Sequence, residues 1–124
     1  MALVVDDDAA NRDILGRLLE RSGWLYDLAD NGQAAVDACA RTHYDLILLD
    51  LFMPGMDGVT CASRIRGLYE RADKAPEGSP YTPRIVAVTG SEGPGAEARS
   101  LFDAELPKPY SMDELKAILD SCPS

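Results

Sequence analysis

The chain has 124 residues, of which 46% are hydrophobic and 27% charged, and its formal net charge is −9. This length suits one domain with a single core, and the composition is typical of a globular protein rather than a disordered one. The negative charge argues against binding nucleic acid, which requires a basic surface. Because the sequence contains neither a bilayer-spanning apolar run nor a signal peptide, we expect a cytoplasmic protein without membrane insertion.

The cysteines argue against a disulfide-rich protein or a cysteine-bound metal cluster. Cys39, Cys61 and Cys122 are odd in number and widely spaced. Neither a disulfide framework nor a cysteine metal cluster follows from that pattern, so we expect buried free thiols.

The first forty residues predict a strand, a helix, a second strand and a second helix. Residues 3–5 form a short β-branched run, and a helix with Asp8 as its N-cap follows. Gly23 is placed to end this helix, residues 24–29 predict the second strand, and Asn31-Gly32 predicts a turn before an alanine-rich helix. The inner face of the first helix is predicted to comprise Ile14, Leu15, Leu18 and Leu19.

The middle of the chain holds the clearest strand. Residues 46–49 are apolar at every position, which is how a strand reads when a parallel sheet buries both of its faces. This strand ends at Asp50, and a Pro-Gly loop leads to a helix over residues 59–69. Residues 72–83 are rich in proline and predict an exposed loop.

The last third predicts two strands and two helices. Residues 85–88 form a strand that ends at Thr89, and residues 94–102 predict a short helix. A stubby strand follows at residues 104–106. Because Pro107 cannot donate a ladder hydrogen bond, this strand is expected at a sheet edge. Ser111 and Glu114 have capping-box spacing, and they open a final helix with Leu115, Ile118 and Leu119 inward.

Five strands alternating with five helices predict an α/β fold in which helices cover both faces of a parallel sheet. Ligands bind such sheets at the carboxyl ends of the strands. The residues at those ends, or just beyond them, are Asp6, Asp7, Asp50, Thr89 and Lys108. We therefore expect these five side chains to converge at one edge.

The chemistry of these residues suits a phosphoryl group and a cation. Three crowded carboxylates repel one another unless a cation lies among them, and an incomplete set of oxygen ligands suits Mg²⁺. A hydroxyl and an ammonium group can bind the remaining phosphoryl oxygens. Each residue alone has an ordinary structural explanation as a cap, a turn or a surface residue, so the prediction depends on their convergence.

The motifs, taken together, resemble the response-regulator receiver domains of two-component signalling. The resemblance covers the whole chain, residues 1–124, as one domain, and it implies a flavodoxin-like sheet with strand order 2-1-3-4-5. The segments that carry it are Val4-Val5-Asp6-Asp7-Asp8, Asn11-Arg12, Asp45-Leu46-Ile47-Leu48-Leu49-Asp50, Met53-Pro54-Gly55-Met56-Asp57-Gly58, Val88-Thr89 and Lys108-Pro109.

The resemblance also implies a role for each site residue. Asp50 would take a phosphoryl group from a phosphohistidine of a histidine kinase or histidine phosphotransfer domain. Mg²⁺ would be held by Asp7 directly, by Asp6 through water, by Asp50 and by the backbone carbonyl of Phe52. Thr89 and Lys108 would bind the phosphoryl oxygens. Such a domain is a signalling phosphoacceptor rather than an enzyme that turns over a separate substrate.

The sequence departs from the family pattern at Glu105. Receivers usually have an aromatic residue at this position, three residues before the lysine, so the usual coupling between threonine and aromatic ring is expected to be absent or altered.

Two other functions stay open. One is a pseudo-receiver, an interaction module that keeps the fold but no longer switches on phosphorylation. The other is a Mg²⁺-dependent aspartyl phosphohydrolase. The second is disfavoured because Phe52 occupies the place, two residues after Asp50, where such enzymes have an aspartate acid.

Overall fold

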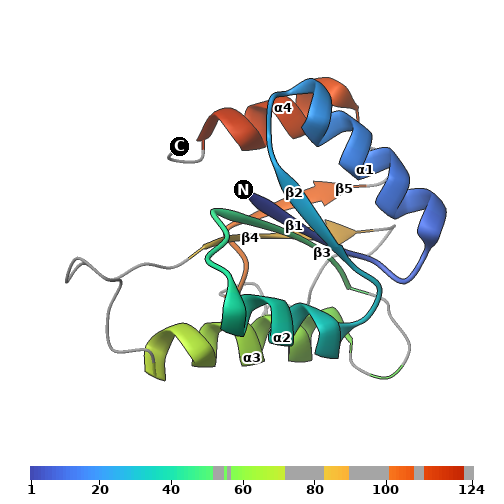
Figure 1. The fold of residues 1–124 in the computed structure, drawn as a ribbon. Helices are drawn as coiled ribbons and strands as arrows, with labels where there is room; N and C mark the ends of the chain where they lie inside the picture. Colours follow the sequence, from blue (N-terminus) through green and yellow to red (C-terminus); the bar gives the residue numbers. More distant parts are fainter. Residues whose placement is uncertain (52–54, 56, 72–82, 90–100, 108–110, 122–124) are drawn as a thin grey trace.

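A five-stranded parallel sheet forms the centre of the molecule in the computed structural model (Figure 1). The structure describes all residues except 52–54, 56, 72–82, 90–100, 108–110 and 122–124. The strands lie in the order β2-β1-β3-β4-β5, so the predicted flavodoxin-like topology is confirmed. Their bounds are β1 Ala2–Val5, β2 Tyr26–Ala29, β3 Leu46–Asp50, β4 Arg84–Thr89 and β5 Ala104–Pro107.

Helices cover both faces of this sheet. α1 (Ala9–Arg21) and α4 (Met112–Ser121) lie on one face, and α2 (Gly32–Arg41) and α3 (Gly58–Arg71) lie on the other. The described residues thus contain four helices where the sequence predicts five. The helix predicted over residues 94–102 falls mostly outside the described residues, as does the loop predicted over residues 72–83. None of the described helices is long and apolar enough to cross a membrane.

The core consists of two clusters, one on each face of the sheet. β3 is buried at every position, as the run of apolar residues predicts. Alternate residues along the strands enter opposite clusters: Ile47 and Leu49 join residues of α2 and α3, whereas Leu46 and Leu48 join residues of α1 and α4. The predicted free thiols Cys39 and Cys61 are buried in the first cluster, while Cys122 lies outside the described residues.

Local signals set the ends of the helices as predicted. The Asp8 side chain accepts a hydrogen bond from the Ala10 amide and caps α1. Asn31, predicted as part of a turn, caps α2 by accepting from the Ala34 amide. Ser111 Oγ accepts from the Glu114 amide at the start of α4. Leu115 and Leu119 of α4 are buried and Ile118 is half-buried.

Two sequence predictions near α1 are wrong. Ile14 is 47% exposed because α1 turns Gly16, rather than Ile14, toward the sheet beside the predicted Leu15 and Leu19. The second strand begins at Tyr26 rather than at Trp24. The reason is that Trp24 belongs to the end of α1: its amide donates to the Leu19 carbonyl, and the amide of Gly23 (φ 81°) donates to Glu20. These two bonds form a Schellman motif, which delays the strand.

Candidate functional site

Three carboxylates meet where β1 and β3 end. Asp6 and Asp7 follow β1, and Asp50 is the last residue of β3. Each residue offers a carboxylate oxygen, and these oxygens lie within 4.8 Å of one another. Asp6 and Asp50 are buried, with 1% and 6% of their surface exposed, whereas Asp7 is exposed to solvent. We call this group the carboxylate triad. Its convergence is what the sequence predicts.

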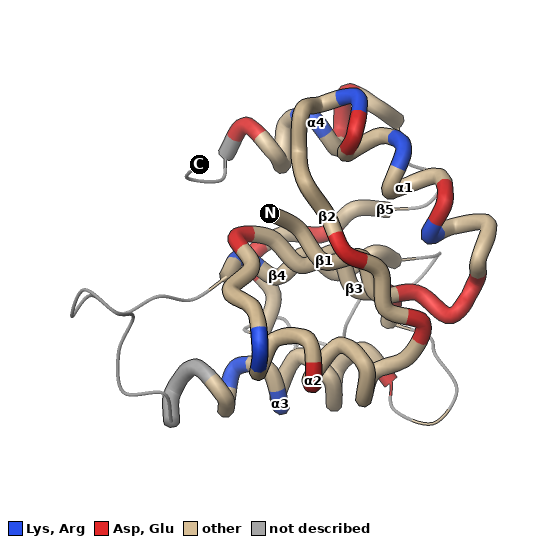
Figure 2. Tube along the Cα trace, viewed as in Figure 1, with Lys and Arg blue, Asp and Glu red and all other residues tan. Residues whose placement is uncertain are grey.

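The sheet register brings the triad together. Val5 of β1 pairs with Leu49 of β3, so the residues that follow them leave the sheet side by side. Figure 2 shows the resulting run of acidic positions where β1 leads into α1. The ends of parallel strands thus concentrate negative charge on one edge.

Asp6 is fixed from several directions. Its amide donates to the Ala29 carbonyl at 3.1 Å, and its Oδ1 accepts from the Asp8 amide at 2.9 Å. Its backbone carbonyl accepts a 2.8 Å hydrogen bond from Nη1 of Arg12. Arg12 belongs to one of the segments that carry the resemblance, but the sequence gives no signal that it reaches back to Asp6. Asp8, in contrast, serves as the helix cap that the sequence predicts.

Gly58, at the start of α3, supports Asp50 by close backbone approach. Its amide donates to the Leu51 carbonyl at 3.0 Å. A Cβ at this position would lie 2.6 Å from the Asp50 carbonyl oxygen and 2.6 Å from Leu51 Cα. Real Cβ atoms do not approach backbone so closely, so only glycine fits here. The sequence shows a glycine in a loop motif, but not that it packs beneath Asp50.

Thr89 reaches the same edge of the sheet. It ends β4, only 4% of its surface is exposed, and the residue before it, Val88, pairs with Asp50. On its other side Thr89 pairs with Pro107 of β5. Four of the predicted site residues, Asp6, Asp7, Asp50 and Thr89, are therefore gathered at one edge. Phe52 and Lys108 lie outside the described residues.

The donor set of the triad fits a hard divalent cation. Carboxylate oxygens are the ligands that Mg²⁺ prefers, and three of them leave coordination positions open for water or phosphate oxygens. Bringing three like charges within 4.8 Å is unfavourable unless a cation offsets them. The triad could therefore hold Mg²⁺, and its member Asp7 is exposed to solvent.

Other titratable groups near the core are held in their neutral forms. Burial raises the pKa of Cys39 to about 12 and that of Cys61 to about 11. Burial, followed by a 2.6 Å hydrogen bond to Asp27, raises the pKa of Tyr44 to about 12. A thiol reacts and binds metals as its thiolate, so neither described cysteine is a candidate nucleophile or ligand at neutral pH.

Glu105, the departure from the family pattern, is exposed on β5. It pairs with Ala87 of β4, two residues before Thr89. Because residues two apart on a strand share a face, Ala87 and Thr89 project to the same side of the sheet.

Comparisons with known proteins agree with this fold. The family model of the response regulator receiver domain matches residues 2–120. The chain is 33% identical over 119 residues to the transcriptional regulatory protein FixJ of Bradyrhizobium diazoefficiens, covering 95% of this chain. It is 37% identical over 120 residues to the sensor histidine kinase AruS of Pseudomonas aeruginosa, covering 94% of this chain.

A solved structure shows the same likeness. The receiver domain of another Pseudomonas aeruginosa sensor histidine kinase, with a magnesium ion in its active-site cleft, superimposes with a TM-score of 0.79 at 26% identity. The alignment covers 96% of this chain and 93% of that one. The chain spans about half or less of the length of its curated relatives, 54% of FixJ and 11% of AruS. On the family match, the sheet order and the position of the triad, the chain belongs to the response regulator receiver domains of two-component signal transduction.

Proposed function

We propose that the chain is a phosphoacceptor, which takes a phosphoryl group onto Asp50 with the help of Mg²⁺ and then changes its interactions with a partner. The observation that carries this proposal is the position of Asp50: it is buried at the end of β3, within 4.8 Å of two further carboxylates and one register position from Thr89. The proposal takes residues 1–124 as one receiver domain, working in the cytoplasm.

The reaction requires little of the protein beyond placement and charge. A carboxylate oxygen of Asp50 attacks the phosphorus of a phosphohistidine in line, forming a P–O bond as the P–N bond breaks. The electron pair stays with the imidazole, which takes a proton from water. Because the transferred group spreads its charge over three oxygens, the site must supply positive charge and hydrogen-bond donors around them.

Each site residue has a part in this step. Asp7 would ligate Mg²⁺ directly and Asp6 through water, with Asp50 and the Phe52 carbonyl completing the protein ligands. When bound, the ion supplies positive charge to the phosphoryl oxygens. The Thr89 hydroxyl would donate to a phosphoryl oxygen, and Lys108, which directly follows Pro107 of the Thr89–Pro107 register pair in the chain, would pair with another.

The donor follows from the family. Receiver domains work with histidine kinases or histidine phosphotransfer domains, and the relatives include a sensor histidine kinase as well as a transcriptional regulator. We therefore propose a phosphohistidine protein as partner, without direct contact to nucleic acid, because the chain carries a net charge of −9.

A pseudo-receiver is the second candidate, and Glu105 favours it. A charged, exposed residue there cannot occupy an apolar slot as an aromatic ring does, so the response to phosphorylation would differ from the usual one. An aspartyl phosphohydrolase has less support, because Phe52 replaces the aspartate that would act as general acid.

The test is the intact mass of the protein after incubation with Mg²⁺ and acetyl phosphate. We expect a gain of one phosphoryl group that requires Mg²⁺ and is absent in Asp50→Asn. Mg²⁺ binding without any adduct from either acetyl phosphate or a phosphohistidine protein would favour the pseudo-receiver. Release of inorganic phosphate at many turnovers per protein would favour the phosphohydrolase.

A further inference from the structure

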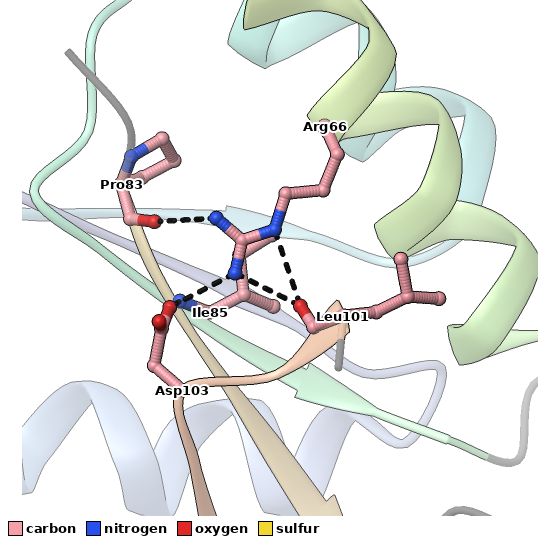
Figure 3. Close-up of polar contacts among 5 residues, drawn as sticks. All are labelled: Arg66, Pro83, Ile85, Leu101 and Asp103. Atoms are coloured by element: carbon pink, nitrogen blue, oxygen red, sulfur yellow. Dashed lines mark hydrogen bonds and ion pairs between the residues drawn. The ribbon is translucent and has the colours of Figure 1, made fainter. Parts of the chain in front are cut away.

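A guanidinium group on α3 joins the residues that precede β4 and β5 (Figure 3). These amino ends lie at the opposite ends of the strands from the carboxylate triad. Arg66 of α3 donates from Nε and Nη2 to the Leu101 carbonyl, at 3.2 and 2.9 Å, and from Nη1 to the Pro83 carbonyl at 3.4 Å. Its Nη2 also lies 2.9 Å from Oδ2 of Asp103. We call this set of contacts the Arg66 clamp.

Asp103 extends the clamp into the sheet. Its Oδ2 accepts a 2.8 Å hydrogen bond from the Ile85 amide, and its own amide donates to the Ile85 carbonyl at 2.8 Å. The two residues thus exchange two hydrogen bonds one position before the first register pair, Val86 with Ala104. Every later pair between β4 and β5 follows from this one.

The sequence of β5 specifies its register only weakly. The strand has four residues, and Leu106 is its one buried position. Pro107 cannot donate a ladder hydrogen bond. A slip of one residue would turn Leu106 out and Glu105 in, which burial of Leu106 opposes, but Leu106 is the one fully buried anchor of this short strand. Contacts outside the strand therefore reinforce this single anchor, and the Arg66 clamp supplies them.

The register matters at the far end of the same two strands. It sets Thr89 opposite Pro107, the residue directly before Lys108 in the chain. We propose that Arg66 and Asp103 are positioning residues, which fix β5 against β4 and so set Thr89 opposite Pro107, the last described residue before Lys108 in the chain, for phosphoryl transfer. This inference rests on the proposed function. The triad does not depend on the clamp in this account, because its carboxylates come from β1 and β3.

Because the carboxylate triad and the Arg66 clamp lie at opposite ends of the strands, Mg²⁺ binding and the rate of phosphorylation can be tested separately. Arg66→Met keeps much of the side-chain length but removes every donor, and Arg66→Lys keeps the charge but cannot reach several acceptors at once. The matched control is Arg17→Met, because Arg17 forms an exposed pair with Asp13 on the surface of α1. Mg²⁺ affinity and the rate of phosphorylation by acetyl phosphate are measured at a temperature at which circular dichroism shows all variants folded.

We expect Arg66→Met to slow phosphorylation about 10- to 100-fold, the effect of a displacement on the order of 1 Å at a reacting group, with unchanged Mg²⁺ affinity. Arg66→Lys should recover part of the rate, and Arg17→Met should match the wild type. A merely structural clamp would lower the melting temperature without changing the rate in the folded protein, and that outcome would overturn the inference.

Amide hydrogen exchange tests the register without phosphorylation. In Arg66→Met and Asp103→Ala, protection of the β4 and β5 amides should fall about tenfold or more, while β1 and β3 stay protected. If the wild type takes no phosphoryl group, the proposed function fails, and this exchange result alone decides whether the clamp holds β5. Unchanged protection in β5 would contradict the inference even if phosphorylation is normal.

Discussion

At the carboxyl ends of the strands, three carboxylates lie within 4.8 Å of one another, whereas at the amino ends carboxylates lie beside cations. Asp103 pairs with Arg66 at 2.9 Å, and Asp45 pairs with the amino group of Met1 at 2.8 Å. The carboxylates of the triad repel one another unless a cation binds among them. At the opposite ends of the strands, the charged groups form ion pairs that hold the strands in place. One sheet thus separates the group that reacts from the contacts that align it.

The largest effect is expected from a single methyl group beneath Asp50. Gly58→Ala would bring Cβ within 2.6 Å of the Asp50 and Leu51 backbone, so the loop must move, and we expect a loss of about 3 kcal/mol in the free energy of unfolding. Gly23→Ala is the matched control. Its φ of 81° disfavours alanine, but no atom lies within 4 Å of the added Cβ, so the loss should be about 1 kcal/mol. Equal losses in urea unfolding would contradict close packing at Gly58.

Mg²⁺ should decide whether the wild type or the Asp50→Asn variant of the carboxylate triad is the more stable protein. Without divalent ions, Asp50→Asn removes one of three crowded charges and should be more stable than the wild type by about 1 kcal/mol. At a Mg²⁺ concentration about 100 times its dissociation constant, the wild type gains about 2.7 kcal/mol by mass action and becomes the more stable protein. Thermal unfolding with EDTA and with Mg²⁺ measures both values. An order that does not change would show that the triad is not the cation site.

At the amino ends of β4 and β5, removing the charge of Arg66 should lower the free energy of unfolding, whether or not Mg²⁺ is present. Arg66→Met removes the guanidinium donors to the Pro83 and Leu101 carbonyls and leaves the Asp103 carboxylate with the Ile85 amide as its donor, so the variant should lose about 2 kcal/mol in the free energy of unfolding, with or without Mg²⁺. The exposed ion pair of Arg17 with Asp13 should contribute no more than about 0.5 kcal/mol to the free energy of unfolding, so Arg17→Met is the control. If Arg66→Met and Arg17→Met lost similar amounts of stability, the Arg66 clamp would contribute no more than an exposed surface ion pair, which would contradict this prediction.

The smallest effect on stability at neutral pH concerns the thiols of Cys39 and Cys61, which lie in the core. The folded pKa values of Cys39 and Cys61, about 12 and 11, lie above the ordinary value of 9.0. Burial therefore favours the neutral thiol, and this contribution to stability is present below pH 9 and is lost as the pH rises toward 11 and 12. In a Cys122→Ser background, alkylation at pH 8 should be about 100-fold slower than in denaturant. Equal rates would show that these thiols are accessible.

The sequence predicts what is local and periodic. The residues at which strands end, the Asp8 cap, the glycine that closes α1 and the burial of residues 46–49 all follow from short patterns. Because parallel strands end at one edge, the convergence of Asp6, Asp7 and Asp50 follows as well. The resemblance to receivers adds the strand order.

Contacts between distant residues leave no such signal. Arg66 lies 35 residues from Leu101 and 37 from Asp103, and nothing around any of them marks the pairing. The role of Gly58 depends on how close α3 comes to β3, which the sequence does not state. The spacing of apolar residues places Ile14 in the core, whereas in the structure Ile14 is exposed and Gly16 packs close to the Tyr26 ring, 2.8 Å from where a Cβ would lie.

The central claim is that Asp50 itself carries the phosphoryl group, and chemical trapping tests it most directly. After incubation with Mg²⁺ and acetyl phosphate, borohydride reduces an acyl phosphate to an alcohol, which converts a phosphorylated aspartate to homoserine. Peptide mapping by mass spectrometry then locates the change. We predict homoserine at position 50 and unchanged aspartate at positions 6 and 7. Homoserine at either of those positions, with Asp50 intact, would contradict it.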